Sequence, residues 1–219
     1  VASLTEPAPT LNQLAYERIE ELIVTLEIAP GAVLSEALLS RRIEIGTTPI
    51  REALQRLARE HLVRILPRRG VVVTEIDVAL QLQVLETRRE LDRLIARSAA
   101  RHATPAEREA LAGIADGMAA RVTAGDLPGF LQYDLRLNAA AGRAARNEVA
   151  ARCVASLHSV ARRFWFHHQS RWSGADRTLA LHVELARSLA SGDVERAGRA
   201  SDAVIDDLDA FARRTVAPL

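Results

Sequence analysis

The stretch PGAVLSEALLSRRIEIGTTPIREALQRLAREHLVRILPRRGVVV, residues 30–73, decides how the first third of the chain folds. Within it, Thr48 and Pro49 predict a helix start, because threonine is a favoured N-cap and proline is tolerated at the first helical position. A shorter helix is predicted from Ser35 to about Ile43, and the tight connection 44–46 joins the two helices. The β-rich runs VRIL and VVV flank a Pro-Arg-Arg-Gly turn, which predicts a small hairpin.

One more helix precedes this stretch. The run LAYERIEELIVTLE, residues 14–27, places apolar residues at helical spacing and gives way to Ala-Pro-Gly. Helix, helix, turn, helix and hairpin form the element order of a winged helix-turn-helix, which we expect over residues 11–76. Residues 1–10 carry neither the basic nor the apolar region of a signal peptide, so we expect a flexible leader there.

After residue 76 the pattern is helical throughout. Asp77 predicts the cap of a long helix ending near His102, and Thr104-Pro105-Ala106-Glu107 forms a capping box. Glycine followed by aspartate, at 125–126 and 192–193, marks a helix stop and a new cap. The further helices are expected at about 105–123, 127–142, 147–168, 175–191 and 194–214. The sequence therefore predicts a mainly α protein, with a bundle of about six helices over residues 77–219.

The composition favours an intracellular protein. The formal net charge is +1, all 29 basic residues are arginine, and the single cysteine excludes an intrachain disulfide. No apolar run reaches the length of a membrane span. A chain of this kind is expected in a reducing cytoplasm, with no membrane partner. Any argument for nucleic-acid binding has to rest on a local patch of charge.

Such a patch lies in the first domain. Residues 1–77 hold nine arginines against eleven acidic residues, whereas residues 41–69 hold eight arginines against three glutamates, a net charge of +5. The excess lies on the turn, the predicted third helix and the hairpin. A basic face on these elements is the electrostatic footprint of DNA binding. A solvated charged face is the alternative, because arginine occurs throughout the chain.

The same stretch resembles the winged-helix domain of GntR-superfamily transcription regulators. The family pattern is Pro-Gly, a Leu-x-Glu helix, a Val-Ser-Arg-Thr-Pro turn, Arg-Glu-Ala-Leu, a Gly-Leu-Val step and a Pro-x-x-Gly wing. Residues 30–73 align with it without gaps, and the departure that matters lies in the turn. There Thr47 replaces the arginine that reads guanine in the family, which implies a different operator. The residues that the resemblance places at the DNA are Arg41, Arg42, Thr47, Thr48, Arg51, Arg68, Arg69 and Gly70.

The second domain resembles the helical, FCD-type ligand-binding domain of one branch of this superfamily. In that branch an aspartate and three histidines hold a metal, and their positions here are Asp134, Asn138, His182 and Val204. Valine cannot ligate and an amide oxygen is a weak ligand for zinc. A divalent metal (zinc, nickel or manganese) at Asp134 and His182 is one hypothesis. Structural roles are a second, with His182 hydrogen-bonded in its helix and Asp134 paired with an arginine. We favour a third, in which a polar group of an effector takes the metal's place.

Arg88 matches the family arginine that faces a ligand carboxylate, which a guanidinium binds bidentately. A surface ion pair with Glu86 or Asp92 is its alternative role. The expected effector-binding residues are therefore Arg88, Asp134, Asn138 and His182. Two features are expected to be structural: the aromatic run 164–166 packs in the core rather than at a pocket or dimer surface, and Cys153 is a buried thiol.

Together these patterns predict a homodimeric transcription regulator, most simply a repressor, that binds double-stranded operator DNA and responds to a small carboxylate-type effector. Two rival classes stay open. One is a DNA-binding protein without an effector, which would show little response to metabolites. The other is an enzyme, for which Asp134 with His182 is the only plausible start of a catalytic set.

Overall fold

The computed structural model describes residues 10–67, 70–168 and 175–215, and its contacts divide the chain into two units. The first unit runs through Ile76 and also includes the segment Arg162–His167. The second unit comprises Asp77–Ala161 and the residues from His168 onward. The sequence pattern assigns all of residues 77–219 to the helical domain, whereas the contacts group six of those residues with the first unit.

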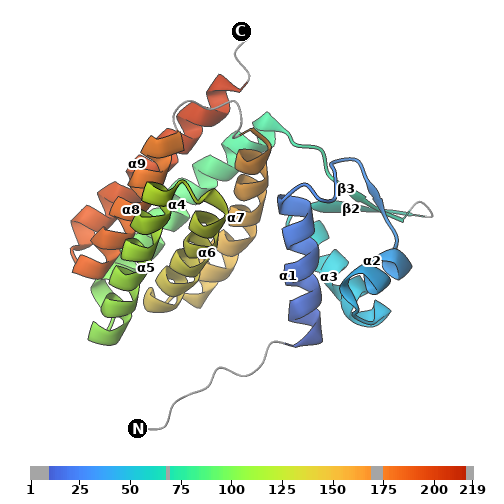
Figure 1. The fold of residues 1–219 in the computed structure, drawn as a ribbon, viewed down its shortest axis with the longest axis horizontal. Helices are drawn as coiled ribbons and strands as arrows, with labels where there is room; N and C mark the ends of the chain where they lie inside the picture. Colours follow the sequence, from blue (N-terminus) through green and yellow to red (C-terminus); the bar gives the residue numbers. More distant parts are fainter. Residues whose placement is uncertain (1–9, 68–69, 169–174, 216–219) are drawn as a thin grey trace. The chain divides into compact units, whose positions relative to one another are not determined.

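The first unit contains three helices and a small sheet (Figure 1). Its elements are α1 (Leu11–Val24), β1 (Val33–Leu34), α2 (Glu36–Ile43), α3 (Thr47–Arg59), β2 (Val63–Leu66) and β3 (Gly70–Val73). The strands are antiparallel in the order β1-β3-β2. The hairpin of β2 and β3 was predicted, but β1 was not, because a two-residue strand has no periodicity of its own. Helices α1 and α3 pack on each other, and their fully buried side chains include Ile19, Ile23, Ile50, Leu54 and Leu57.

The start of α3 differs from the prediction. The helix begins at Thr47 with Gly46 as its N-cap, so the expected cap at Thr48 with Pro49 in the first helical position was wrong. Proline is still tolerated there, because the first-turn N–H groups have no partner within the helix. Before it, Glu44 ends α2 in the left-handed region at φ 56°, which makes the connection tight. The shift places Thr47 and Thr48 inside the first turn of α3, with both side chains exposed.

The second unit is built from six helices in its described residues. They are α4 (Val78–His102), α5 (Pro105–Ala124), α6 (Leu127–Ala144), α7 (Glu148–His168), α8 (Ala175–Ser191) and α9 (Val194–Arg214). Within α7, the segment Arg162–His167 is grouped with the first unit. The predicted caps are confirmed: Asp77, Thr104, Asp126 and Asp193 each accept a backbone N–H of the helix that follows. The capping box of Thr104 and Glu107 is complete.

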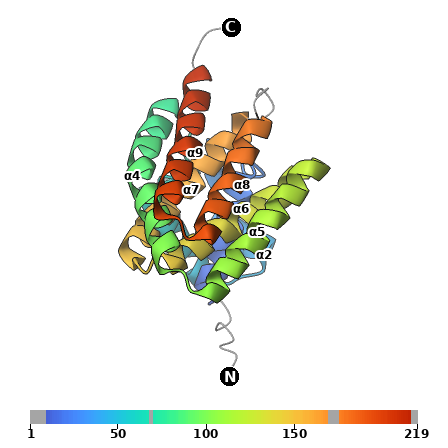
Figure 2. The same ribbon diagram turned by 90° about the vertical axis from the view of Figure 1, so that its left-hand side faces the viewer.

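Alanine-rich faces bring these helices close together. Much of the buried core is alanine, and it closes around a few larger side chains, among them Leu111, Met118, Phe130, Leu137 and Leu189. Helix α4 lies along α9, and α5 lies against α6 and α8, as Figure 2 shows for α4 and α9. None of the described helices combines the length and apolar character that crossing a membrane requires.

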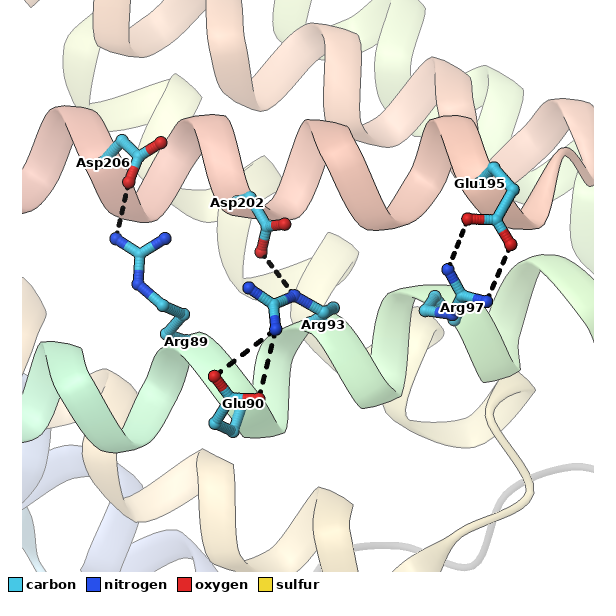
Figure 3. Close-up of polar contacts among 7 residues, drawn as sticks. All are labelled: Arg89, Glu90, Arg93, Arg97, Glu195, Asp202 and Asp206. Carbon is cyan, nitrogen blue, oxygen red and sulfur yellow. Dashed lines mark hydrogen bonds and ion pairs between the residues drawn. The ribbon is translucent and has the colours of Figure 1, made fainter.

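A row of ion pairs joins α4 to α9 (Figure 3). Arg97 makes a bidentate pair with Glu195 at 2.6 and 2.7 Å, Arg93 contacts Asp202 at 2.8 Å, and Arg89 contacts Asp206 at 2.6 Å. The arginines are four residues apart, so they share one face of α4. Because the partner numbers rise as the arginine numbers fall, the two helices run antiparallel.

Cys153 corrects another expectation. Its thiol is exposed, although alanine and valine lie close to it in the sequence. The buried positions of this part of α7 include Ala150 and Val154, so the helix turns the intervening Cys153 side chain away from the core.

Candidate DNA-binding surface and effector site

The exposed start of α3 carries three of the predicted DNA contacts. The side chains of Thr47, Thr48 and Arg51 are exposed, while Ile50 between them is fully buried in the core. The cap residue Gly46 has no side chain to satisfy the first backbone N–H groups of the helix. Hydroxyls, free N–H groups and a guanidinium therefore share one end of this helix, an arrangement suited to phosphate and base edges.

Arg51 is tied to a residue that the sequence analysis did not single out. Its Nε donates to Glu36 Oε1 at 3.0 Å and its Nη2 donates to Glu36 Oε2 at 2.8 Å. Glu36 is the first residue of α2, where the helix dipole favours a carboxylate. The hydrogen bonds from Arg51 lower the pKa of Glu36, and those to Glu36 raise the pKa of Arg51. The sequence shows the Leu-x-Glu pattern that contains Glu36, but it does not show that Arg51 is the partner of this glutamate.

A second set of contacts joins α3 to α1. The guanidinium of Arg56 lies 3.5 Å from the ring centroid of Tyr16 on α1, and its Nε donates to Glu60 at 3.0 Å. The Tyr16 hydroxyl donates to Glu60 at 2.6 Å. Burial raises the pKa of Tyr16, and the hydrogen bond to Glu60 raises it further. These contacts hold Arg56 against α1, so it is the arginines on the other faces of α3 that stay accessible.

The other predicted DNA contacts lie on α2 and the wing. Arg41 and Arg42 are exposed in the last turn of α2, and Arg42 pairs with Glu27 at 2.8 Å. Gly70 opens β3 at φ +88°, a conformation that favours glycine. The predicted wing-tip residues Arg68 and Arg69 lie outside the described residues.

In the second unit, the structure brings together Asp134, Asn138 and His182. Asn138 Nδ2 donates to Asp134 Oδ2 at 3.2 Å, and His182 Nε2 lies 3.9 Å from Asp134 Oδ1. His182 Nδ1 is 2.8 Å from the backbone oxygen of Thr178, to which it donates. In neutral His182 this leaves Nε2 as an acceptor beside the carboxylate. The hydrogen-bonded role considered for His182 is confirmed, whereas Asp134 contacts Asn138 and His182 rather than an arginine among the described contacts.

The fit to a metal ion can be tested on these residues. Asp134 and His182 supply two suitable donors, and the Nδ1–H bond to Thr178 is the support that a metal-binding imidazole usually has. Val204, at the fourth position, is a buried apolar residue of α9. Within the described part of the chain, no three histidine, cysteine, aspartate or glutamate side chains are grouped so as to hold a metal. The donor set does not fit the four-ligand site of the family.

Arg88 lies in a different set of contacts. Its Nε donates to Asp92 Oδ2 at 3.0 Å, and His158 Nε2 of α7 lies 3.0 Å from Asp92 Oδ1. Of the two partners considered for Arg88, the structure shows Asp92, but the pair is largely buried rather than on the surface. Burial alone would raise the pKa of Asp92, but the charges of Arg88 and His158 outweigh it and hold that pKa at about 2. None of the described contacts joins Arg88 to Asp134 or His182.

The aromatic run on α7 is mostly buried. Phe164 and Trp165 are 2% and 7% exposed, as expected for core packing. Arg163, which directly precedes this run, is fully buried. It donates to the Thr74 backbone oxygen at 3.0 Å, within the first unit. Burial lowers the pKa of Arg163 to about 10.

Comparison with known families covers both units. Residues 11–73 match the family model described as bacterial regulatory proteins, gntR family, and residues 83–207 match the FCD domain. The second match covers more than half of the chain, and the first contains α1–α3 and all three strands.

Relatives and solved structures agree with these matches. An uncharacterized HTH-type transcriptional regulator from Agrobacterium vitis is 32% identical over 127 residues, 57% of this chain and 74% of that protein. The HTH-type transcriptional repressor RspR of Escherichia coli K12 is 24% identical over 214 residues, 98% of this chain and 94% of RspR. The structure of E. coli McbR/YncC superimposes with a TM-score of 0.80 at 16% identity, covering 96% of this chain and 100% of that one. The last comparison concerns the fold alone.

Proposed function

This chain belongs to the gntR family of bacterial regulatory proteins and carries an FCD domain, and we propose that it is a homodimeric repressor released from its operator by a small organic acid. Its family and its relatives are transcription regulators, and this chain is likewise a DNA-binding transcription regulator and not an enzyme. The operator contacts, the effector and the sense of regulation are the parts proposed.

The observation that carries the DNA contact is the exposed first turn of α3. We place this end of the helix in the major groove, where the N-terminal residues of a recognition helix reach base edges. Thr47 and Thr48 offer hydroxyls and methyl groups, and Arg51 offers its guanidinium. Arg41 and Arg42 contact the backbone, with Arg68, Arg69 and Gly70 at the wing. One such head covers few base pairs, so two chains on two half-sites give useful specificity.

The first prediction concerns Arg51. An operator selected from random duplexes with the wild-type protein should lose at least about tenfold in affinity with Arg51→Ala, because one bidentate arginine contact is lost. Fluorescence anisotropy measures the affinity, and titration at high DNA concentration should give two chains per operator. Arg152→Ala is the matched control, since it removes an exposed arginine from α7. A wild-type protein that selects no common sequence would contradict the proposed function.

For the effector, the support is the FCD domain and the polar group of Asp134, Asn138 and His182. These side chains present Asp134 Oδ1 and His182 Nε2 as acceptors, which suits a hydroxyl or another donor group. Among the described contacts Arg88 donates to Asp92 through its Nε, and we assign its Nη groups to the carboxylate of the effector. A hydroxy acid combines the two groups. That the relative RspR is named a repressor supports repression as the sense of regulation.

The second prediction tests the effector and the metal together. Protein treated with a chelator and then freed of it should keep its melting temperature and should respond to small hydroxy acids with a rise in that temperature. Arg88→Gln should remove the rise, because the guanidinium that binds the carboxylate is gone. Arg152→Gln should leave it intact. The metal hypothesis would be correct instead if untreated protein contained near-stoichiometric zinc, nickel or manganese, and if the chelator removed this metal and lowered the melting temperature.

A further inference from the structure

We infer that Glu36 is a specificity-determining residue, which directs Arg51 to a base edge and away from the phosphate backbone. The inference rests on the proposed DNA contact of α3 and asks which part of the DNA Arg51 reads. Glu36 and Arg51 come from the two helices of the helix-turn-helix, α2 and α3.

The geometry leaves one edge of the guanidinium open. A guanidinium has five N–H groups, arranged along two edges that can each make a bidentate contact. Glu36 occupies the edge of Nε and Nη2, at 3.0 and 2.8 Å. The edge formed by Nη1 and the second hydrogen of Nη2 remains, and the Arg51 side chain is 65% exposed. Two parallel N–H groups at a fixed position match the O6 and N7 acceptors of guanine.

The charge of the Glu36–Arg51 pair affects a contact to phosphate differently from a contact to a base. A free arginine gains affinity from a phosphate because neutralising it releases counterions. Arg51 is already neutralised by Glu36, and the carboxylate repels an approaching phosphate. Guanine is uncharged, so it can share the guanidinium with Glu36 at little electrostatic cost. The pair therefore weakens contacts to any sequence and preserves the contact to one base.

Holding the guanidinium in place also favours base reading. Arginine has a long side chain whose rotamer freedom is lost when it binds. In this domain the carboxylate restricts that freedom before DNA arrives, so the cost of ordering at the base is smaller. The position of Glu36 at the first residue of α2 is itself fixed by the backbone of the helix.

The third prediction therefore concerns Glu36→Gln, which keeps the shape of the side chain and removes its charge. For the selected operator and a scrambled duplex, the ratio of the two affinities should fall about tenfold. The scrambled duplex should bind more tightly, and the slope of log K against log salt should steepen by about one, as Arg51 gains a phosphate. Glu148→Gln is the matched control, because it frees Arg152 from an exposed pair on α7, away from the proposed DNA contacts.

A second variant keeps the inference testable if Glu36→Gln fails to fold. Arg51→Lys retains the positive charge but has no fork, so it should bind the scrambled duplex as wild type does and lose the preference for the operator. Wild-type discrimination that survives intact in either variant would overturn the role of Glu36. A wild-type protein without any operator preference would instead contradict the proposed function, and Arg51→Ala separates the two cases.

Discussion

Single residues in the second unit show how charge is accommodated in a core. Asp92 is enclosed between Arg88 of its own helix and His158 of α7, each at 3.0 Å. The favourable charges outweigh burial, so Asp92 stays ionised with a pKa of about 2. A carboxylate in this position ties α4 to α7, at a distance of 66 residues along the chain.

The fourth prediction follows from that pKa. Because the folded value lies below the unfolded one, Asp92 contributes stability above about pH 4, and that contribution is lost as the pH falls toward 2. Asp92→Asn should lower the free energy of unfolding at neutral pH by about 3 kcal/mol, since Arg88 is left buried without its partner. The difference between wild type and variant should shrink on acidification. Urea unfolding at several pH values measures it, with Asp116→Asn on the exposed face of α5 as control. An equal difference at all pH values would argue against an ionised Asp92.

Among the elements, α4 and α9 are the two helices that the ion pairs in Figure 3 connect. Three arginines on α4 face three acidic residues on α9, so every member of the row meets an opposite charge. Sliding either helix by one turn would leave an end residue without its partner. We interpret the row as a feature that fixes the register between these two long helices.

The fifth prediction tests this at the end of the row. Arg97→Glu places a glutamate opposite Glu195 and should lower the melting temperature, because like charges then face each other across the helices. The exchanged pair, Arg97→Glu with Glu195→Arg, should recover most of the loss. The recovery should be smaller at high salt, which screens exposed charges. Arg152→Glu, which breaks a pair within α7, is the control. A double variant no more stable than Arg97→Glu would mean that the pair does not couple.

At the scale of the whole molecule, features with local causes could be predicted from the sequence. The caps at Asp77, Thr104, Asp126 and Asp193 depend on residues within four positions, so their chemistry is legible in the chain. The helix order and the hairpin followed from these signals and from periodicity. The start of α3 at Thr47 could not be predicted from these signals, because threonine is acceptable both as a cap and in a first turn.

Features that depend on contacts between distant elements were missed. β1 exists because Val33 and Leu34 pair with β3, about forty residues later. Glu36 was visible only as part of a pattern, and its role at Arg51 appears when α2 and α3 are placed side by side. The same holds for His158, which carries no motif and meets Asp92 through packing. The candidate DNA contacts, in contrast, were named from the resemblance of residues 30–73 and stay a prediction.

The exposed Cys153 has a practical consequence. It is the single cysteine of the sequence, and it lies on α7, in the second unit, among residues with no proposed role in DNA or effector binding. A maleimide-linked spin label or dye will therefore attach at one defined position per chain without prior mutagenesis. Two labelled chains on one operator would report a single label-to-label distance, with and without effector, and so give a direct spectroscopic measure of how the protomers move.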